Sequence, residues 1–210
     1  LKGALTYRGS ESERQWVIDP IDGTQGYIKE LFYAVAIGFM HESDPKACAV
    51  AMPRYNERGL AVFLAEKDEG TKASYGGASF QPVSVNNEEN LNEITLCRSL
   101  HHDTPWIDEF AQRANIEDFI RLDSMGKFCM IADGTAALYI KPLDSQPSFS
   151  WDYLPPALIL TEAGGKYTDF KGNPITFEGK ECKWKAGGVI GSNGFIHDEA
   201  LTLIDQLDVL

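Results

Sequence analysis

Residues 16–24 read Trp-Val-Ile-Asp-Pro-Ile-Asp-Gly-Thr. The apolar residues that open this stretch predict a short buried strand, and Pro20 favours an extended conformation for the residue before it. In layered α/β proteins, functional side chains often lie just beyond the ends of such strands. We therefore expect a strand that ends at Asp19 and a chemically active turn immediately after it.

Two carboxylates lie three positions apart in this turn, on Asp19 and Asp22. Because proline fixes φ between them, both can point at one locus if the strand turns there, and the carbonyl of Ile21 then faces the same way. Such an all-oxygen set suits a hard cation such as Mg²⁺, which keeps water and phosphate oxygens as its other ligands. Asp-Pro and Asp-Gly are also common turn dipeptides, so a plain turn is the alternative.

The two residues that follow extend the pattern toward phosphate chemistry. Gly23 allows a phosphate to approach the backbone, and the amides of Gly23 and Thr24 would add donors at the start of a helix. The hydroxyl of Thr24 would lie within reach of a water bound to the metal. The stretch therefore predicts a phosphate site beside a cation.

A second informative segment, residues 151–156, reads Trp-Asp-Tyr-Leu-Pro-Pro and leads into an apolar helix predicted for residues 154–163. Asp152 lies where this helix begins, and prolines are tolerated in a first helical turn. An N-cap role is the plain interpretation of Asp152. If its carboxylate instead converges on Asp19 and Asp22, three crowded negative charges require a cation to neutralise them.

A third segment, residues 122–128, reads Leu-Asp-Ser-Met-Gly-Lys-Phe. Ser124 and Lys127 lie three positions apart, so on a helix they would share one face and could hold a phosphate together. The spacing also occurs in β-lactamases, but the Ser-Asp-Asn and Lys-Thr-Gly motifs of those enzymes are absent. The neighbouring pair His101 and His102 would point apart on any regular element, which favours a surface loop.

The remaining sequence predicts a layered α/β protein. An antiparallel meander is expected from residues 32–40, 47–52 and 60–65, followed by a hairpin turn and loop over residues 66–79. Strands and helices then alternate to the end of the chain. We expect a first lobe over residues 1–115 and a second over residues 116–210. The elements expected in the later part are strands at 94–97, 119–122, 136–140 and around 189–190, and helices at 106–114, 124–133, 154–163 and from 197 onward.

Composition excludes several classes of partner. The 210 residues include 31 acidic and 19 basic side chains, and a formal net charge of −12 disfavours nucleic acid and anionic membranes. No apolar run approaches the roughly 18–20 residues of a membrane span. The four cysteines, at positions 48, 97, 129 and 182, have no zinc-like spacing, which favours reduced thiols and an intracellular location, cytoplasmic or organellar.

Residues 16–24 and 151–165 together resemble the two signatures of the inositol-monophosphatase-like, Mg²⁺-dependent, lithium-sensitive phosphatases. The middle of the chain resembles their 3'(2'),5'-bisphosphate nucleotidase branch, through residues 25–35, 123–128 and 139–142. The resemblance implies a layered α/β/α/β/α sandwich whose N-terminal helices are missing here, with the site between an antiparallel and a mixed sheet. It also implies removal of the 3'-phosphate from 3'-phosphoadenosine 5'-phosphate, a small phosphorylated metabolite.

The resemblance further implies roles for individual residues. The Mg²⁺ ligands would be Asp19, the Ile21 carbonyl, Asp22 and Asp152, with Asp19 and Thr24 catalytic and Asp152 also contacting substrate. Gly23 and Thr24 would hold the scissile phosphate, and Thr24 would orient the attacking water. The residues expected to bind the rest of the nucleotide are Ser124, Lys127, Lys141, which replaces the arginine usual in this branch, and His102.

Departures from the family pattern leave other interpretations open. The family places an acidic pair well before the first signature, and this chain starts too late to contain it, which predicts a fragment or a truncated protein with weak metal binding. The sheet face left bare would favour an oligomer. One alternative is an inositol monophosphatase or another sugar-phosphate phosphatase, which residues 37–39 also fit. The other is a non-catalytic phosphonucleotide-binding protein of the same fold.

Overall fold

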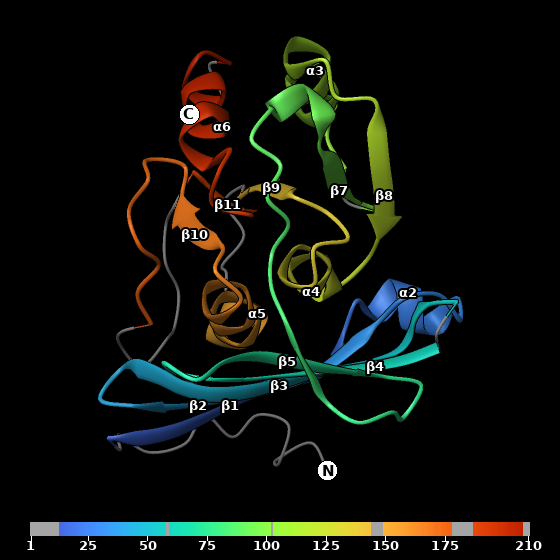
Figure 1. Cartoon of the computed structure of the whole chain (residues 1–210), viewed down its shortest axis with the longest axis vertical. Helices are drawn as coiled ribbons and strands as arrows, with labels where there is room; N and C mark the ends of the chain where they lie inside the picture. The colour runs from blue at the N-terminus through green and yellow to red at the C-terminus, as the bar shows by residue number, and fades with distance from the viewer. Residues whose placement is uncertain (1–12, 58, 102, 144–148, 178–186, 208–210) are drawn as a thin grey trace.

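In the computed structural model, the described residues are 13–57, 59–101, 103–143, 149–177 and 187–207. Within them, two β-sheets and two pairs of helices alternate as layers (Figure 1). Helices α4 and α5 lie between the sheets, and α3 and α6 lie on the other side of the second sheet (Figure 1). The helices in these ranges are α2 (Thr24–Ile28), α3 (Pro105–Ala114), α4 (Gly126–Ala132), α5 (Ser150–Glu162) and α6 (His197–Asp205), and η1 (Leu91–Glu93) is a 3₁₀ turn.

The first sheet is an antiparallel meander in which six strands follow one another in chain order. Buried and more exposed residues alternate along β2, because one face of the sheet packs against α5 and the other faces outward. The predicted meander is therefore confirmed. Its strands are β1 (Arg14–Asp22), β2 (Ala34–His41), β3 (Asp44–Asn56), β4 (Gly59–Glu66), β5 (Gly70–Tyr75) and β6 (Gln81–Val83).

The prediction of a hairpin turn and loop over residues 66–79 is wrong, because β5 occupies the middle of this segment. Its glycines lie at or beyond the ends of the strand, where positive φ values form the turns at Gly70, Gly76 and Gly77. The sequence did not predict this strand because Thr71, at a buried position, is polar. Its hydroxyl donates to the carbonyl of Ile159 at 2.7 Å.

The second sheet is mixed and has the strand order β10-β11-β9-β7-β8. Strand β7 runs parallel to β8 and β9, whereas β11 is antiparallel to both of its neighbours. A second buried cluster forms between this sheet and the pair α3 and α6. The strands are β7 (Thr95–Ser99), β8 (Asp118–Leu122), β9 (Leu138–Pro142), β10 (Lys166–Asp169) and β11 (Gly188–Ser192).

The expected boundary between residues 115 and 116 does not coincide with the change of sheet. Strand β7 and helix α3 precede residue 116, yet β7 pairs with β8 and β9 of the second sheet. The change falls between Val83, which ends β6, and Thr95, which begins β7. A division into two lobes remains a prediction.

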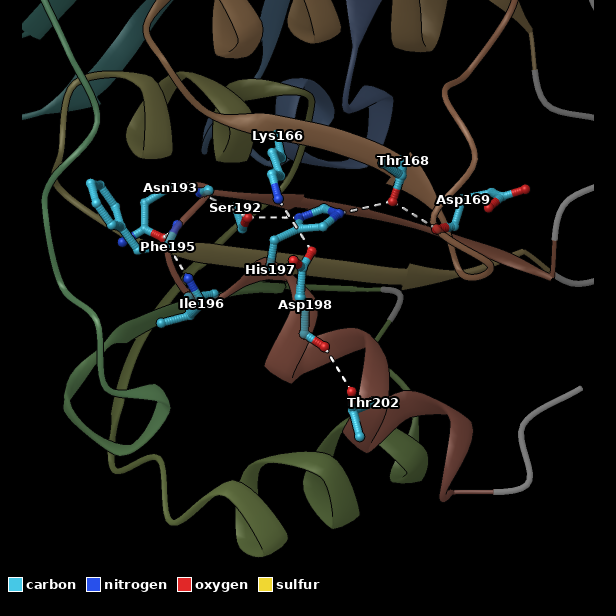
Figure 2. A network of polar contacts seen from close by, with 11 residues as sticks. Lys166, Thr168, Asp169, Ser192, Asn193, Phe195, Ile196, His197, Asp198 and Thr202 are labelled. Carbon is cyan, nitrogen blue, oxygen red and sulfur yellow. Dashed lines mark hydrogen bonds and ion pairs between the residues drawn. The ribbon is translucent and has the colours of Figure 1, made fainter.

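A buried histidine connects β10, β11 and α6 (Figure 2). The ring of His197 contacts the hydroxyls of Ser192, 2.7 Å from Nδ1, and Thr168, 2.9 Å from Nε2. Because the Thr168 hydroxyl donates to the carbonyl of Asp169, it must accept from Nε2–H, and Nδ1 then accepts from Ser192. Burial lowers the pKa of His197 to about 4, so the ring is neutral and holds the helix against the sheet.

The outward face of the first sheet exposes large apolar side chains, including Trp16, Ile18, Val35 and Ile37. The expected oligomer remains a prediction.

None of the helices in the described ranges has the length and apolarity needed to cross a membrane. Three cysteines, at positions 48, 97 and 129, are buried free thiols, and Cys182 lies outside the described residues.

Candidate metal centre and its cavity

Three carboxylates from distant parts of the chain meet between β1 and α5. Asp19 and Asp22 lie at the C-terminal end of strand β1, and Asp152 lies in the first turn of α5. One carboxylate oxygen from each residue lies within 4.8 Å of those of the other two. This convergence is the geometry that the metal-ligand prediction requires, while the ligand role itself remains a prediction.

A β-bulge brings the two carboxylates of β1 together. In a regular strand, residues three apart point to opposite faces of the sheet. Here Asp19 pairs with Ala36 and Asp22 with Ala34, so β1 contains one residue more than β2 between these pairs. Asp19 Oδ1 also accepts a hydrogen bond from the Ile21 amide at 3.1 Å. The expected strand end at Asp19 is therefore wrong, because the strand continues to Asp22 and the bulge turns the side chains.

Burial and mutual repulsion raise the pKa values of the three carboxyl groups. Burial, followed by the charge of Asp22, raises the pKa of Asp19 to about 6. Burial, followed by the charges of Asp22 and Asp19, raises the pKa of Asp152 to about 7. Burial also raises the pKa of Asp22, although the Met125 amide donates to its carboxylate. An all-oxygen cluster whose negative charges are this costly fits a divalent cation, and the three carboxylates could hold a metal ion.

Gly23 and Thr24 connect this cluster to α2. Gly23 is the N-cap of the helix and has a φ of 82°, a left-handed conformation that glycine adopts without strain. The hydroxyl of Thr24 donates to the carbonyl of Ile21 at 3.4 Å. The helix begins at Thr24, as the sequence predicts.

The N-cap interpretation of Asp152 is wrong. The helix begins at Ser150 and its N-cap is Phe149, so Asp152 is the third helical residue. Pro155 and Pro156 therefore lie beyond the first turn, contrary to expectation.

The prediction that Ser124 and Lys127 share a helical face is also wrong. Ser124 precedes α4 and has a φ of 78°. This left-handed conformation is rare for serine, so the sequence does not predict it. Its hydroxyl accepts from the Gly126 amide at 3.1 Å. The ammonium of Lys127 is buried and donates to the carbonyls of Ser124 at 2.7 Å and Leu122 at 3.2 Å. Lys127 therefore closes the turn between β8 and α4.

A cavity of about 410 Å³ adjoins the carboxylates. Lys141 contributes a further cation, with its Nζ 5.6 Å from the centre of the Tyr153 ring. Ile21 and Asp19 are not among the lining residues, and His102 lies outside the described part of the chain. The predicted site residues that line the cavity are Asp22, Gly23, Thr24, Ser124, Lys127, Lys141 and Asp152.

Sequence reasoning missed other residues of this cavity. Asp123 and Asp103 line it, and His101 contacts Asp123. Lys29 in turn contacts His101. The position of Asp123 beside Ser124 was a usable signal, whereas nothing in the sequence relates Lys29 to residues more than 70 positions away.

Comparison with known proteins identifies the class. The model of the inositol monophosphatase family matches residues 2–208, so the chain belongs to the inositol monophosphatase family. The probable 3'(2'),5'-bisphosphate nucleotidase 4 of Arabidopsis thaliana is 32% identical over 199 residues, which cover 90% of this chain and 58% of that protein. The 3',5'-bisphosphate nucleotidase 2 of the same plant is 30% identical, with 83% and 56% covered. The chain thus spans less than two thirds of the length of these two relatives.

Solved structures give the same fold. An inositol monophosphatase from Anabaena (Nostoc) superposes with a TM-score of 0.76 at 21% identity, covering 96% of this chain and 75% of that one. The Staphylococcus aureus inositol monophosphatase II with bound 2'-AMP gives 0.72 at 23% identity, covering 94% and 71%. The predicted layered α/β fold of this family is confirmed.

Proposed function

We propose that the protein is a metal-dependent phosphatase that removes the 3'-phosphate from 3'-phosphoadenosine 5'-phosphate, releasing AMP and phosphate. The observation that carries this proposal is the convergence of Asp19, Asp22 and Asp152 beside a cavity. The names of the two Arabidopsis relatives support the nucleotide substrate. Mg²⁺ is the proposed ion, because it prefers carboxylate ligands and shares its remaining positions with water and phosphate.

The carboxylates of Asp19, Asp22 and Asp152 and the carbonyl of Ile21 would hold the ion. When bound, it would lower the pKa of a coordinated water and neutralise charge on the phosphate. The hydroxyl hydrogen of Thr24 is directed at Ile21, so the Thr24 oxygen can accept a hydrogen from a water. Accepting that hydrogen orients a lone pair of the water toward the phosphorus atom, which is the positioning contribution expected of Thr24.

Binding of the second phosphate depends on the cations of the cavity. Lys141 is exposed in part and lines the cavity, so its ammonium can reach a ligand. Lys127 also lines it, but two carbonyls accept from two of the three N–H donors of its ammonium. We therefore assign the second phosphate to Lys141 and treat Lys127 as a support of the cavity wall.

The hydrogen bonds of Ser124 and Lys127 favour a second candidate function. The Ser124 hydroxyl accepts from the Gly126 amide and the Lys127 ammonium donates to two carbonyls, which disfavours a phosphate held jointly by these two side chains. A single lysine is a modest site for a second phosphate, which an inositol or other sugar monophosphate does not carry. A sugar-monophosphate phosphatase is therefore the alternative.

Phosphate release measured with Mg²⁺ tests both functions. The substrates are 3'-phosphoadenosine 5'-phosphate, inositol monophosphate and histidinol phosphate, with EDTA as the blank. The proposal predicts the highest kcat/KM on the bisphosphate, and release only from the monophosphates would establish the alternative. Calorimetric binding of the bisphosphate without any release would instead indicate a non-catalytic binding protein.

A matched pair of lysine variants sharpens the comparison. Lys141→Ala should lower kcat/KM for the bisphosphate about tenfold more than for inositol monophosphate, because only the bisphosphate loses a charge-assisted contact. Lys171→Ala removes an exposed lysine of a turn and should change neither rate. Equal losses on both substrates in Lys141→Ala would contradict the assignment of the second phosphate.

A further inference from the structure

The cavity contains a buried carboxylate that the proposed reaction does not use. Asp123 lies in the turn between β8 and α4, is 4% exposed and lines the cavity. Its Oδ1 is buried and has no hydrogen-bond partner among the described residues. Leaving a charged acceptor unpaired is costly, so a donor from a molecule in the cavity would stabilise this group.

The other oxygen of Asp123 is held by a chain of hydrogen bonds. Lys29 Nζ lies 2.6 Å from Nε2 of His101, and Nδ1 of the same ring contacts Asp123 Oδ2. An ammonium has no lone pair, so Lys29 donates and Nε2 must accept. The proton of the neutral ring is then on Nδ1, and His101 donates to Asp123. The carboxylate is thereby fixed in orientation, while Oδ1 has no donor from the described residues.

Asp123 also lies next to the phosphate end of the cavity. A Cβ added to Gly23 would lie 3.4 Å from the Cβ of Asp123, and one added to Gly26 would lie 3.4 Å from its Oδ2. Gly23 directly follows Asp22 of the carboxylate cluster. A molecule whose phosphate lies at that cluster would therefore place the adjoining atoms of its alcohol part near Asp123.

We propose that Asp123 is a specificity-determining residue whose Oδ1 accepts a hydrogen bond from a hydroxyl or amino group on the alcohol part of the phosphomonoester. His101 is the positioning residue for this carboxylate. The inference rests on the proposed phosphatase function and adds a requirement for a donor on the leaving group. It also predicts that a second phosphate avoids this wall, since two negative charges repel at such distances.

The test compares substrates with and without a donor. 3'-Phosphoadenosine 5'-phosphate and inositol monophosphate carry hydroxyl groups beside the ester, whereas phenyl phosphate has no donor on its leaving group. Asp123→Asn removes the charge and should lower kcat/KM for both donor-bearing substrates about tenfold or more, mainly through KM. The loss on phenyl phosphate should be about fivefold smaller. The quantity compared is the ratio of kcat/KM on each donor-bearing substrate to kcat/KM on phenyl phosphate. Asp118→Asn, on the exposed start of β8, is the matched control and should leave both ratios unchanged.

A second pair of variants tests the positioning role. His101→Ala should shift the ratio in the same direction as Asp123→Asn. His101→Asn, whose side-chain amide can replace the Nδ1–H donor, should restore most of it, which a merely structural role would not predict. If Asp123→Asn fails to fold, judged by its thermal melt, the two His101 variants test the role of Asp123 in its place. An unchanged ratio in His101→Ala, or no rescue by His101→Asn, then overturns the inference.

The outcomes separate this inference from the function. Phosphate release by the wild type with equal losses on all three substrates would overturn the role of Asp123 and leave the phosphatase proposal intact. If the wild type releases no phosphate, calorimetry with AMP and phenyl phosphate takes the place of kinetics. Asp123→Asn must then weaken AMP binding more than phenyl phosphate binding, and equal weakening, or no binding of AMP to the wild type, overturns the inference.

Discussion

At the scale of single residues, the carboxylate cluster is a balance between repulsion and a few compensating donors. Asp22 accepts from the Met125 amide, and Asp19 accepts from the Ile21 amide. Burial and the charges of Asp22 and Asp19 raise the pKa of Asp152 to about 7. The charge of Asp152 is therefore costly in the absence of a cation.

Asp152→Asn should weaken divalent-cation binding and lower kcat/KM by about 100-fold or more, because a neutral amide replaces one of three charged ligands. Titration with Mn²⁺ or Mg²⁺ by calorimetry measures the first effect, and phosphate release measures the second. Asp68→Asn is the control, since Asp68 lies in a turn with a φ of 66° that asparagine also adopts. Wild-type affinity in Asp152→Asn would rule out a ligand role for this residue.

The sequence predicted the three carboxylates that the fold brings together. Asp19 and Asp22 belong to one short motif, and Asp152 to a second, so their candidacy needed no knowledge of packing. The conformation of Ser124 could not be predicted, because a φ of 78° in a serine reflects the turn that Lys127 stabilises. The selection of His102 rested on resemblance alone and stays a prediction, because this residue lies outside the described part of the chain.

At the scale of elements, the turn between β8 and α4 supports the cluster from the side. Lys127 holds the carbonyls of Leu122 and Ser124, and the next amide, that of Met125, donates to Asp22. Lys127→Ala should therefore lower kcat/KM for bisphosphate and monophosphate substrates by similar factors. A loss confined to the bisphosphate would contradict this and return Lys127 to the role of a phosphate ligand.

Helix α2 is held close to the following loop through a glycine. A Cβ at Gly26 would lie 1.9 Å from the carbonyl oxygen of Phe32, so the backbone must move to accept it. Gly26→Ala should destabilise the fold by about 1–3 kcal/mol although alanine is the better helix former. It should also lower activity, because α2 begins at Thr24.

Denaturant unfolding of Gly26→Ala measures this effect, and Gln25→Ala in the same helix is the control. Gln25 is exposed, so its truncation should change the unfolding free energy by no more than about 0.5 kcal/mol. A neutral or stabilising Gly26→Ala would show that α2 is not constrained as described.

Elements were predictable where the alternation of buried and exposed residues is regular, as along β2. Prediction failed where a polar residue is buried, as at Thr71 of β5, or where a helix starts before its apolar run, as α5 does at Ser150. The β1 bulge was also beyond sequence reasoning, because its register is set by pairing with β2.

At the scale of the whole molecule, the cluster links stability to pH and to metal. The folded-state pKa values of Asp19, about 6, and Asp152, about 7, exceed the ordinary 3.8. The folded state then binds protons more tightly than the unfolded state, so the contribution of these groups is present at low pH and is lost as pH rises through about 6 to 7.

In EDTA, the wild type should therefore lose more thermal stability between about pH 5 and pH 8 than the double variant Asp19→Asn/Asp152→Asn. Adding Mg²⁺ at the higher pH should restore the Tm of the wild type but not that of the double variant. Thermal melts at the two pH values provide the measurement. Identical pH dependence in both proteins would show that the fold does not raise the pKa values of Asp19 and Asp152.

The most direct test of the account is the location of a bound ion. Crystals of the protein soaked in Mn²⁺ can be examined by anomalous diffraction, which identifies the metal independently of its surroundings. We predict a peak bonded to carboxylate oxygens of Asp19, Asp22 and Asp152. Density that shows these three side chains apart, with no ion between them at saturating Mn²⁺, would contradict the central claim.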